Sequence, residues 1–127
     1  MYHADSPTGQ LKVYDYAKPG EAGRVLQTYA DGSVPDGACV DCDRRVWVAA
    51  WGGGAVVVHD AQGFVLGRIP VPAKQPTCTA LGGEDMDILA VTSASIGLGS
   101  EASEGDGGLH LFRVEGRGLR EVVASYR

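Results

Sequence analysis

The sequence contains Val34-Pro35-Asp36-Gly37-Ala38-Cys39-Val40-Asp41, which is followed after three residues by Arg45-Val46-Trp47-Val48-Ala49-Ala50-Trp51-Gly52-Gly53-Gly54. Proline fixes one backbone dihedral and glycine allows conformations that other residues avoid, so we expect a tight Pro-Asp-Gly corner to hold Asp36. The corner leads into a short strand, a polar turn, a second strand, a glycine loop and a third strand over residues 55–60. This order predicts one blade of a β-propeller, with Asp36 as its chemical residue.

The sequence also repeats with a period in the low forties. The aligned segments are 46–48 with 1–3 and 58–60 with 13–15, both 45 residues apart, and 46–49 with 88–91, which are 42 apart. A period of this length with four strands per repeat is typical of propellers, whereas sandwiches do not repeat in this way. We therefore predict an all-β fold of four-stranded antiparallel blades, with roughly eleven short strands, the last over residues 119–126, and no helix.

The repeat count predicts part of a ring. We expect a single partial propeller domain over residues 1–127, with blades at approximately residues 1–30, 34–70 and 76–127 and with the first strand of the first blade missing. Propellers close with about four to eight blades, so the chain would be roughly half of one. The open ends would expose strand edges and apolar blade faces, which we expect a second copy or a partner chain to cover.

Composition narrows the class of protein. With 127 residues, of which 44% are hydrophobic, the chain can form one domain with a core. The net charge of −5 argues against a nucleic-acid partner, and no apolar run is long enough to cross a membrane. The N-terminus lacks the features of a signal peptide, and three cysteines do not suggest a disulfide framework. We therefore expect a reducing, cytoplasmic location.

Cys39 and Cys42 form a C-x-x-C pair, which is typical of zinc sites when a second such pair is present. A structural zinc site uses four nitrogen or sulfur ligands, and this sequence has no second pair. We therefore expect Cys39 to point from its strand into the core.

The order of strands predicts which loops share one end of the blades. In an up-and-down blade, the loop before the first strand and the loop between the second and third strands lie at the same end. That end, which we call the mouth, would collect residues 6–9, 31–37, 51–54, 71–77 and 93–108. Loops held by a rigid scaffold often carry function, so we expect the binding site at the mouth.

Five motifs occur in an order and at a spacing that resemble a known family. They are Met-Tyr-x-x-Asp-Ser at residues 1–6, Pro-Asp-Gly-x-Cys-x-Asp at 35–41, Val-Trp-Val-Ala at 46–49 with Gly-Gly at 53–54, Cys-x-x-Leu-Gly-Gly at 78–83, and Leu-Ala-Val-Thr-Ser-Ala at 89–94. Over nearly the whole chain they resemble the C-terminal half of the gluconolactonase, regucalcin and luciferin-regenerating enzyme family. The resemblance implies about half of a six-bladed propeller, from a family that binds a divalent metal on its axis and hydrolyses sugar lactones and related esters.

The resemblance implies that Asp36 is a metal ligand and the catalytic base. The implied function is the C-terminal half of a sugar lactone hydrolase that opens the lactone ring with metal-activated water. Calcium is the first choice of metal, and zinc, magnesium and manganese are alternatives. The family's other ligands, a glutamate and two asparagines in many members, would lie upstream of this chain, so Asp36 with water should bind metal weakly. The alternative is a non-catalytic propeller fragment or binding module that needs a partner chain, and the residues leave open whether this chain alone is an enzyme.

Three further residues are candidates for the substrate pocket. Trp51 could stack on substrate or cover the blade edge, and Thr77 and Cys78 occupy the third blade's equivalent of the Asp36 corner. We expect the three histidines to lie in packing or surface positions along strands; they are His3, His59 and His110. The acidic segment 101–106 matches no calcium loop, and we expect it to be a solvated loop.

Overall fold

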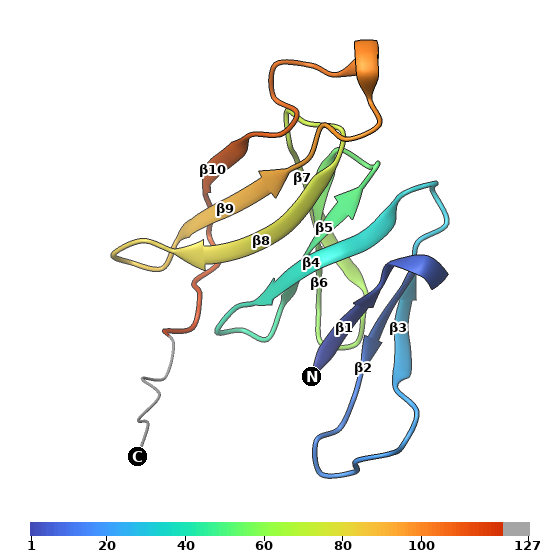
Figure 1. The fold of residues 1–127 in the computed structure, drawn as a ribbon. Coiled ribbons are helices and arrows are strands. Elements are labelled where there is room, and N and C mark those ends of the chain that lie inside the picture. Colours follow the sequence, from blue (N-terminus) through green and yellow to red (C-terminus); the bar gives the residue numbers. More distant parts are fainter. Residues whose placement is uncertain (121–127) are drawn as a thin grey trace, which may run out of the picture.

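The computed structural model describes residues 1–120 and consists almost entirely of antiparallel strands (Figure 1). Three sheets follow one another along the chain. They contain β1 (Tyr2–Asp5), β2 (Gln10–Val13) and β3 (Arg24–Thr28); β4 (Val34–Val40), β5 (Val46–Trp51), β6 (Ala55–His59) and β7 (Val65–Pro70); and β8 (Pro76–Gly82), β9 (Ile88–Ser93) and β10 (Leu109–Arg113). The predicted all-β class is confirmed, and the fold is a partial propeller in which each sheet is one blade.

The described residues hold ten strands and two short 3-10 turns, η1 (Ser6–Thr8) and η2 (Gly99–Glu101), with no α-helix. Accordingly, no helix in residues 1–120 has the length and apolar character needed to cross a bilayer. The strand expected over residues 119–126 falls mostly outside the described residues. The expected corner at Asp36 is wrong, because β4 already begins at Val34 and contains Asp36 within it.

The core lies on both faces of blade two. Strands β5 and β6 are buried along nearly their whole length, as continuous apolar runs predict for strands covered on both sides. On one face, Trp47 and Val56 pack in a cluster with Leu89 of blade three. On the other face, Val46 packs in a cluster with Leu11 of blade one. Blade two therefore holds its neighbours in place by apolar packing on each side.

The inner strands β4 and β8 run side by side in the same direction and begin at the same end of the molecule (Figure 1). The turn η1, the β5–β6 loop, the β7–β8 connection and the segment before β10 gather at that end, as strand order predicts. Two hydrogen bonds tie these loops together. The Ser6 hydroxyl donates to the Pro35 carbonyl at 2.7 Å, and the Lys74 backbone N–H donates to the Asp106 carboxylate at 2.6 Å.

Tyr29 and His59 connect blades one and two through a hydrogen bond. The Tyr29 hydroxyl lies 2.9 Å from His59 Nε2, and His59 Nδ1 lies 3.1 Å from the Gly63 carbonyl oxygen. Since a carbonyl can only accept, Nδ1 carries the proton and Nε2 accepts from the tyrosine. Burial lowers the pKa of His59 and the Gly63 carbonyl offsets this only in part, while burial raises the pKa of Tyr29. Both side chains are therefore neutral near pH 7.

We expect the free energy of unfolding to fall as the pH drops below about 6.5. The unfolded chain binds a proton at His59 near that pH, whereas the folded chain binds it only at its lowered pKa. The stabilisation from His59 is therefore complete above the pKa of His59 in the unfolded chain. It is lost as the pH falls from that pKa to the lower pKa of the folded chain. Urea unfolding at several pH values measures the effect. His59→Gln should flatten the profile, and His3→Gln, at an exposed position of β1, should not. Equal slopes for wild type and His59→Gln would contradict this expectation.

Candidate functional site

Asp36 lies at a bulge near the start of β4. The strand pairs on either side are Pro35 with Ala50 and Ala38 with Val48. Asp36 and Gly37 together therefore lie opposite a single residue of β5. A bulge of this kind turns a side chain away from the regular alternation of a strand, and such bulges are frequent beside active sites. Pro35 is fully buried, which fixes the backbone immediately before the bulge.

The Asp36 carboxylate has no cationic partner within residues 1–120, although its side chain is half-buried. Desolvation raises its pKa above the ordinary value, and the backbone N–H of Gly37 lowers it by less. By contrast, Asp5 is paired with Lys12 at 2.6 Å and has a lowered pKa because of that hydrogen bond. A partly desolvated carboxylate with no counter-charge can either hold a cation or take up a proton.

Gly37 allows β8 to touch β4 beside Asp36. A Cβ atom at position 37 would lie 2.5 Å from Cys78 Sγ and 2.8 Å from Cys78 Cα. Side chains do not tolerate such short distances, so close packing of the two inner strands requires glycine here. The contact places Cys78, and Thr77 before it, next to Asp36.

We expect Gly37→Ala to lower the free energy of unfolding by about 1–3 kcal/mol, as is usual when an extra carbon is forced into a packed contact. Gly82→Ala is a matched control on β8, because a Cβ there would meet nothing within 4 Å. It should change stability by less than about 0.5 kcal/mol. Urea unfolding of both variants makes the comparison, and equal effects would show that the Gly37 contact does not hold the strands together.

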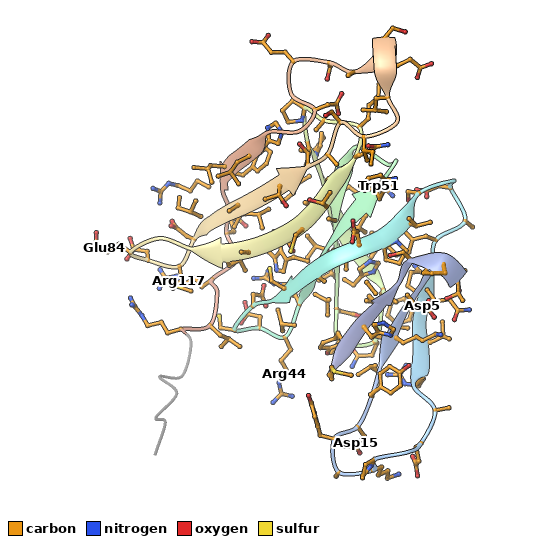
Figure 2. The ribbon with its side chains drawn as sticks, viewed as in Figure 1. Asp5, Asp15, Arg44, Trp51, Glu84 and Arg117 are labelled. Atoms are coloured by element: carbon orange, nitrogen blue, oxygen red, sulfur yellow. The ribbon has the colours of Figure 1, made fainter. Side chains whose placement is uncertain are left out.

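The structure brings the other predicted site residues to the same end. Trp51 ends β5 at the mouth and is half-buried, while Arg44 and Glu84 lie at the opposite end (Figure 2). Thr77 lies in β8, half-buried, and Cys78 follows it at an exposed position. All four candidates therefore lie on neighbouring strands at one end of blades two and three.

Sequence reasoning missed how the segment before β10 is held. His110 Nε2 lies 3.0 Å from the Gly105 carbonyl, and the Ser93 hydroxyl donates to the Gly108 carbonyl at 3.0 Å. A Cβ at Gly105 would lie 1.6 Å from the Pro72 carbonyl oxygen, so this segment packs directly on the β7–β8 connection. The acidic side chains are largely exposed, as expected, but the loop itself is docked on the mouth. His110 is therefore not a plain surface residue. Its position just after a glycine-rich run was the sequence feature that could have indicated this contact.

The residues present supply one ligand for a hard cation. Within residues 1–120, no group of three or more His, Cys, Asp or Glu side chains could hold a metal ion. Asp36 fits as an anionic oxygen ligand, since no other cation competes for it. Calcium takes about six to eight oxygens, so water and other residues would have to complete the set. Cys39 packs against the core between blades two and three, as expected, and Cys42 is exposed.

Two grooves on the described surface include none of the four candidate residues. One, of about 400 Å³, is lined by the glycine loop, the β7–β8 connection and Ser103. The other, of about 370 Å³, lies between blades one and two and is lined by Tyr29, His59 and Arg68 among others.

Comparisons with known proteins agree on one family. The family described as SMP-30/Gluconolactonase/LRE-like region matches residues 1–95. L-arabinolactonase of Azospirillum brasilense is 40% identical over 126 residues, which are 94% of this chain and 41% of the relative. Pentonolactonase XacC of Haloferax volcanii is 41% identical over 115 residues, which are 81% of this chain and 39% of the relative. The chain thus spans about two fifths of the length of these relatives.

A solved structure agrees with the fold. It is a calcium-binding protein, regucalcin, from Agrobacterium tumefaciens, which superimposes with a TM-score of 0.83 at 30% identity. The match covers 94% of this chain and 43% of that chain. The three blades therefore correspond to a little under half of a related propeller.

Proposed function

Because this chain belongs to the SMP-30/gluconolactonase/LRE-like family, we propose that it is the C-terminal half of a divalent-metal-dependent sugar lactone hydrolase. The observation that carries the proposal is Asp36, a half-buried carboxylate without a counter-charge, placed by a bulge at the mouth. The names of the two curated relatives, both lactonases, support the substrate class. The activity would belong to a complete ring, of which this chain covers about two fifths.

Asp36 would hold the metal together with oxygen ligands from outside the described residues. Calcium is our first choice, since the related structure is of a calcium-binding protein; zinc, magnesium and manganese are the alternatives. A bound divalent cation supplies polarisation of the lactone carbonyl and a lower pKa for water. We also propose a cytoplasmic location with a sugar lactone as the small-molecule partner, and no nucleic-acid or membrane partner.

Asp36 would also act as the base. It takes a proton from the attacking water, whose oxygen forms a bond to the lactone carbonyl carbon. The ring C–O ester bond then breaks, and the proton passes from Asp36 to the departing ring oxygen. The product is an open-chain hydroxy acid, and Asp36 returns to its carboxylate form. Trp51, at the same end, offers an aromatic face on which the sugar ring can stack.

A second candidate function is a non-catalytic fragment or binding module that needs a partner chain to complete the site. A second copy or another chain would then cover the open blade faces. The observation that favours it is that residues 1–120 hold no group of three or more His, Cys, Asp or Glu side chains that could bind a metal ion. This candidate keeps the mouth as a place where a sugar lactone binds, without turnover by the chain alone.

Hydrolysis of L-arabino-1,4-lactone with and without calcium separates the two functions. Calcium-dependent acid release by this chain supports the hydrolase. No release, together with binding of the lactone, supports the binding module. Binding can be followed at Cys78, because a ligand at the mouth should slow the reaction of its thiol with a disulfide reagent. Cys42, exposed in the turn between β4 and β5, serves as an internal control. If lactone changed the modification rate of neither Cys78 nor Cys42, a binding site at the mouth would be contradicted.

A further inference from the structure

We propose that the hydroxyls of Thr77 and Thr92 form a substrate-binding pair beside Asp36, which accepts and donates hydrogen bonds to the hydroxyls of the sugar lactone. The inference rests on the proposed function. It gives a chemical role to Thr77, already a pocket candidate, and adds Thr92 to the same site. It starts from the likeness of the two inner strands, which the family resemblance does not supply.

Strand β8 repeats the construction of β4. In β8, Pro76 pairs with Ser93 and Cys78 pairs with Thr92, so Thr77 is the extra residue of a bulge. In β4 the bulge likewise follows a proline, Pro35, and both prolines are fully buried. Thr77 is thus the blade-three counterpart of Asp36. The two strands present a carboxylate and a hydroxyl at matching positions around the axis.

The two positions are also close in space. A Cβ built at Gly37 would lie 2.8 Å from the Cα of Cys78, so the residues that directly follow Asp36 and Thr77 are in contact. A lactone that reacts at Asp36 carries hydroxyls on the ring carbons around its carbonyl. Those hydroxyls would face the neighbouring inner strand, where Thr77 lies.

The hydroxyl pair has unused hydrogen-bonding capacity. Thr77 Oγ1 lies 2.7 Å from Thr92 Oγ1, and within residues 1–120 neither hydroxyl has another partner. Two hydroxyls carry two O–H groups, and only one of these is used between them. The other O–H and the remaining lone pairs are available to a ligand. A sugar hydroxyl also both donates and accepts, so it matches this pair. Thr92 is exposed and Thr77 half-exposed, which leaves the pair accessible.

A purely structural role is the competing explanation, in which the hydroxyl pair only joins β8 to β9. Thr77→Val keeps the shape of the side chain and removes the hydroxyl, and Thr77→Ser keeps the hydroxyl. Thr28→Val, on β3 at an exposed position of blade one, is the matched control. All variants are made in the full chain, with L-arabino-1,4-lactone as ligand and calcium present.

If the wild-type chain hydrolyses the lactone, we expect Thr77→Val to raise KM about threefold to tenfold with a small change in kcat, as the loss of one hydrogen bond implies. Thr77→Ser should restore most of this loss, and Thr28→Val should match wild type. Unchanged KM in Thr77→Val would overturn the inference and leave the proposed function standing. A structural role would instead lower stability in urea without a change in KM that serine rescues.

If the wild-type chain does not hydrolyse the lactone, protection of the Cys78 thiol decides the matter. Lactone should slow modification of the Cys78 thiol in wild type and in Thr77→Ser. In Thr77→Val, the lactone concentration that gives the same protection should be about threefold to tenfold higher. Each protein is compared with itself in the absence of lactone, since residue 77 adjoins the thiol. Equal protection in wild type and Thr77→Val, or no protection in wild type, would overturn the inference.

Discussion

Asp36→Asn is expected to lower calcium-dependent lactone hydrolysis by about 10²- to 10⁴-fold. The substitution keeps the shape of the side chain and removes both the negative charge and the group that takes the proton. It also removes the anionic oxygen ligand that we propose for the metal, so calcium affinity should fall together with kcat. Initial rates of acid release over a range of calcium concentrations measure both effects.

The same variant should not lose stability. Asp36 is desolvated without a cationic partner, which raises its pKa and means that folding disfavours its charged form. An uncharged amide removes that penalty, so the free energy of unfolding should stay the same or rise slightly. Residues that serve function at the expense of stability commonly behave in this way.

Asp85→Asn is the matched control for Asp36→Asn. Asp85 is an exposed carboxylate in the turn between β8 and β9, at the end opposite the mouth. It should leave both hydrolysis and calcium affinity unchanged. If Asp36→Asn destabilised the fold and its activity fell only in proportion to the folded fraction, Asp36 would be a structural residue of the bulge, and the proposed role would be wrong.

The repeat and the apolar runs of the sequence predict the all-β propeller class, because the strands of each blade pack in the same way. Strands covered on both faces need apolar residues at every position, and β5 and β6 carry such runs. The turn between β5 and β6, residues 52–54, consists of three glycines. Local pattern and global fold therefore agree over blade two, where Trp47 and Val46 point to opposite neighbours.

The bulge at Asp36 could not be predicted in the same way. Local preference favours a turn at Pro-Asp-Gly, but pairing of Val34 with Trp51 and of Pro35 with Ala50 continues the strand through it. The register of two paired strands depends on the residues that pack on them, and a local motif of four residues does not determine it. The Tyr29–His59 hydrogen bond could not be predicted for a related reason, because it joins two residues that are 30 apart in sequence and lie in different blades.

The contribution of Asp41 to stability could not be predicted from the sequence. In the sequence it belongs to an ordinary polar turn, but in the structure its side chain has no exposed surface. One carboxylate oxygen accepts from Arg45 Nε at 2.6 Å and from Trp47 Nε1 at 2.9 Å. The other accepts from the backbone N–H groups of Asp43 and Arg45, both at 2.9 Å. Burial alone would raise the pKa of Asp41, but the hydrogen bonds from Trp47 and Arg45 outweigh it and lower the pKa.

We therefore expect Asp41→Ala to lower the free energy of unfolding by about 3–5 kcal/mol. The variant leaves the indole N–H of Trp47 buried without an acceptor and removes the counter-charge of Arg45. Since Trp47 belongs to the cluster that joins blades two and three, the loss should spread to the contact between them. Urea unfolding followed by tryptophan fluorescence measures the effect. In wild type, the stabilisation from Asp41 should be lost as the pH falls from the ordinary value of an unfolded aspartate through the lowered pKa of the folded state.

Asp43→Ala provides the comparison, because Asp43 contacts the same arginine from solvent. Its side chain is 66% exposed and lies 3.0 Å from Arg45 Nη2. Exposed pairs of this kind contribute about 0–1 kcal/mol, so Asp43→Ala should be nearly neutral. If both variants lost the same stability, the arginine contact alone would explain it. A loss confined to Asp41→Ala means that the buried carboxylate stabilises the fold through Trp47 and the turn backbone, which the exposed one does not touch.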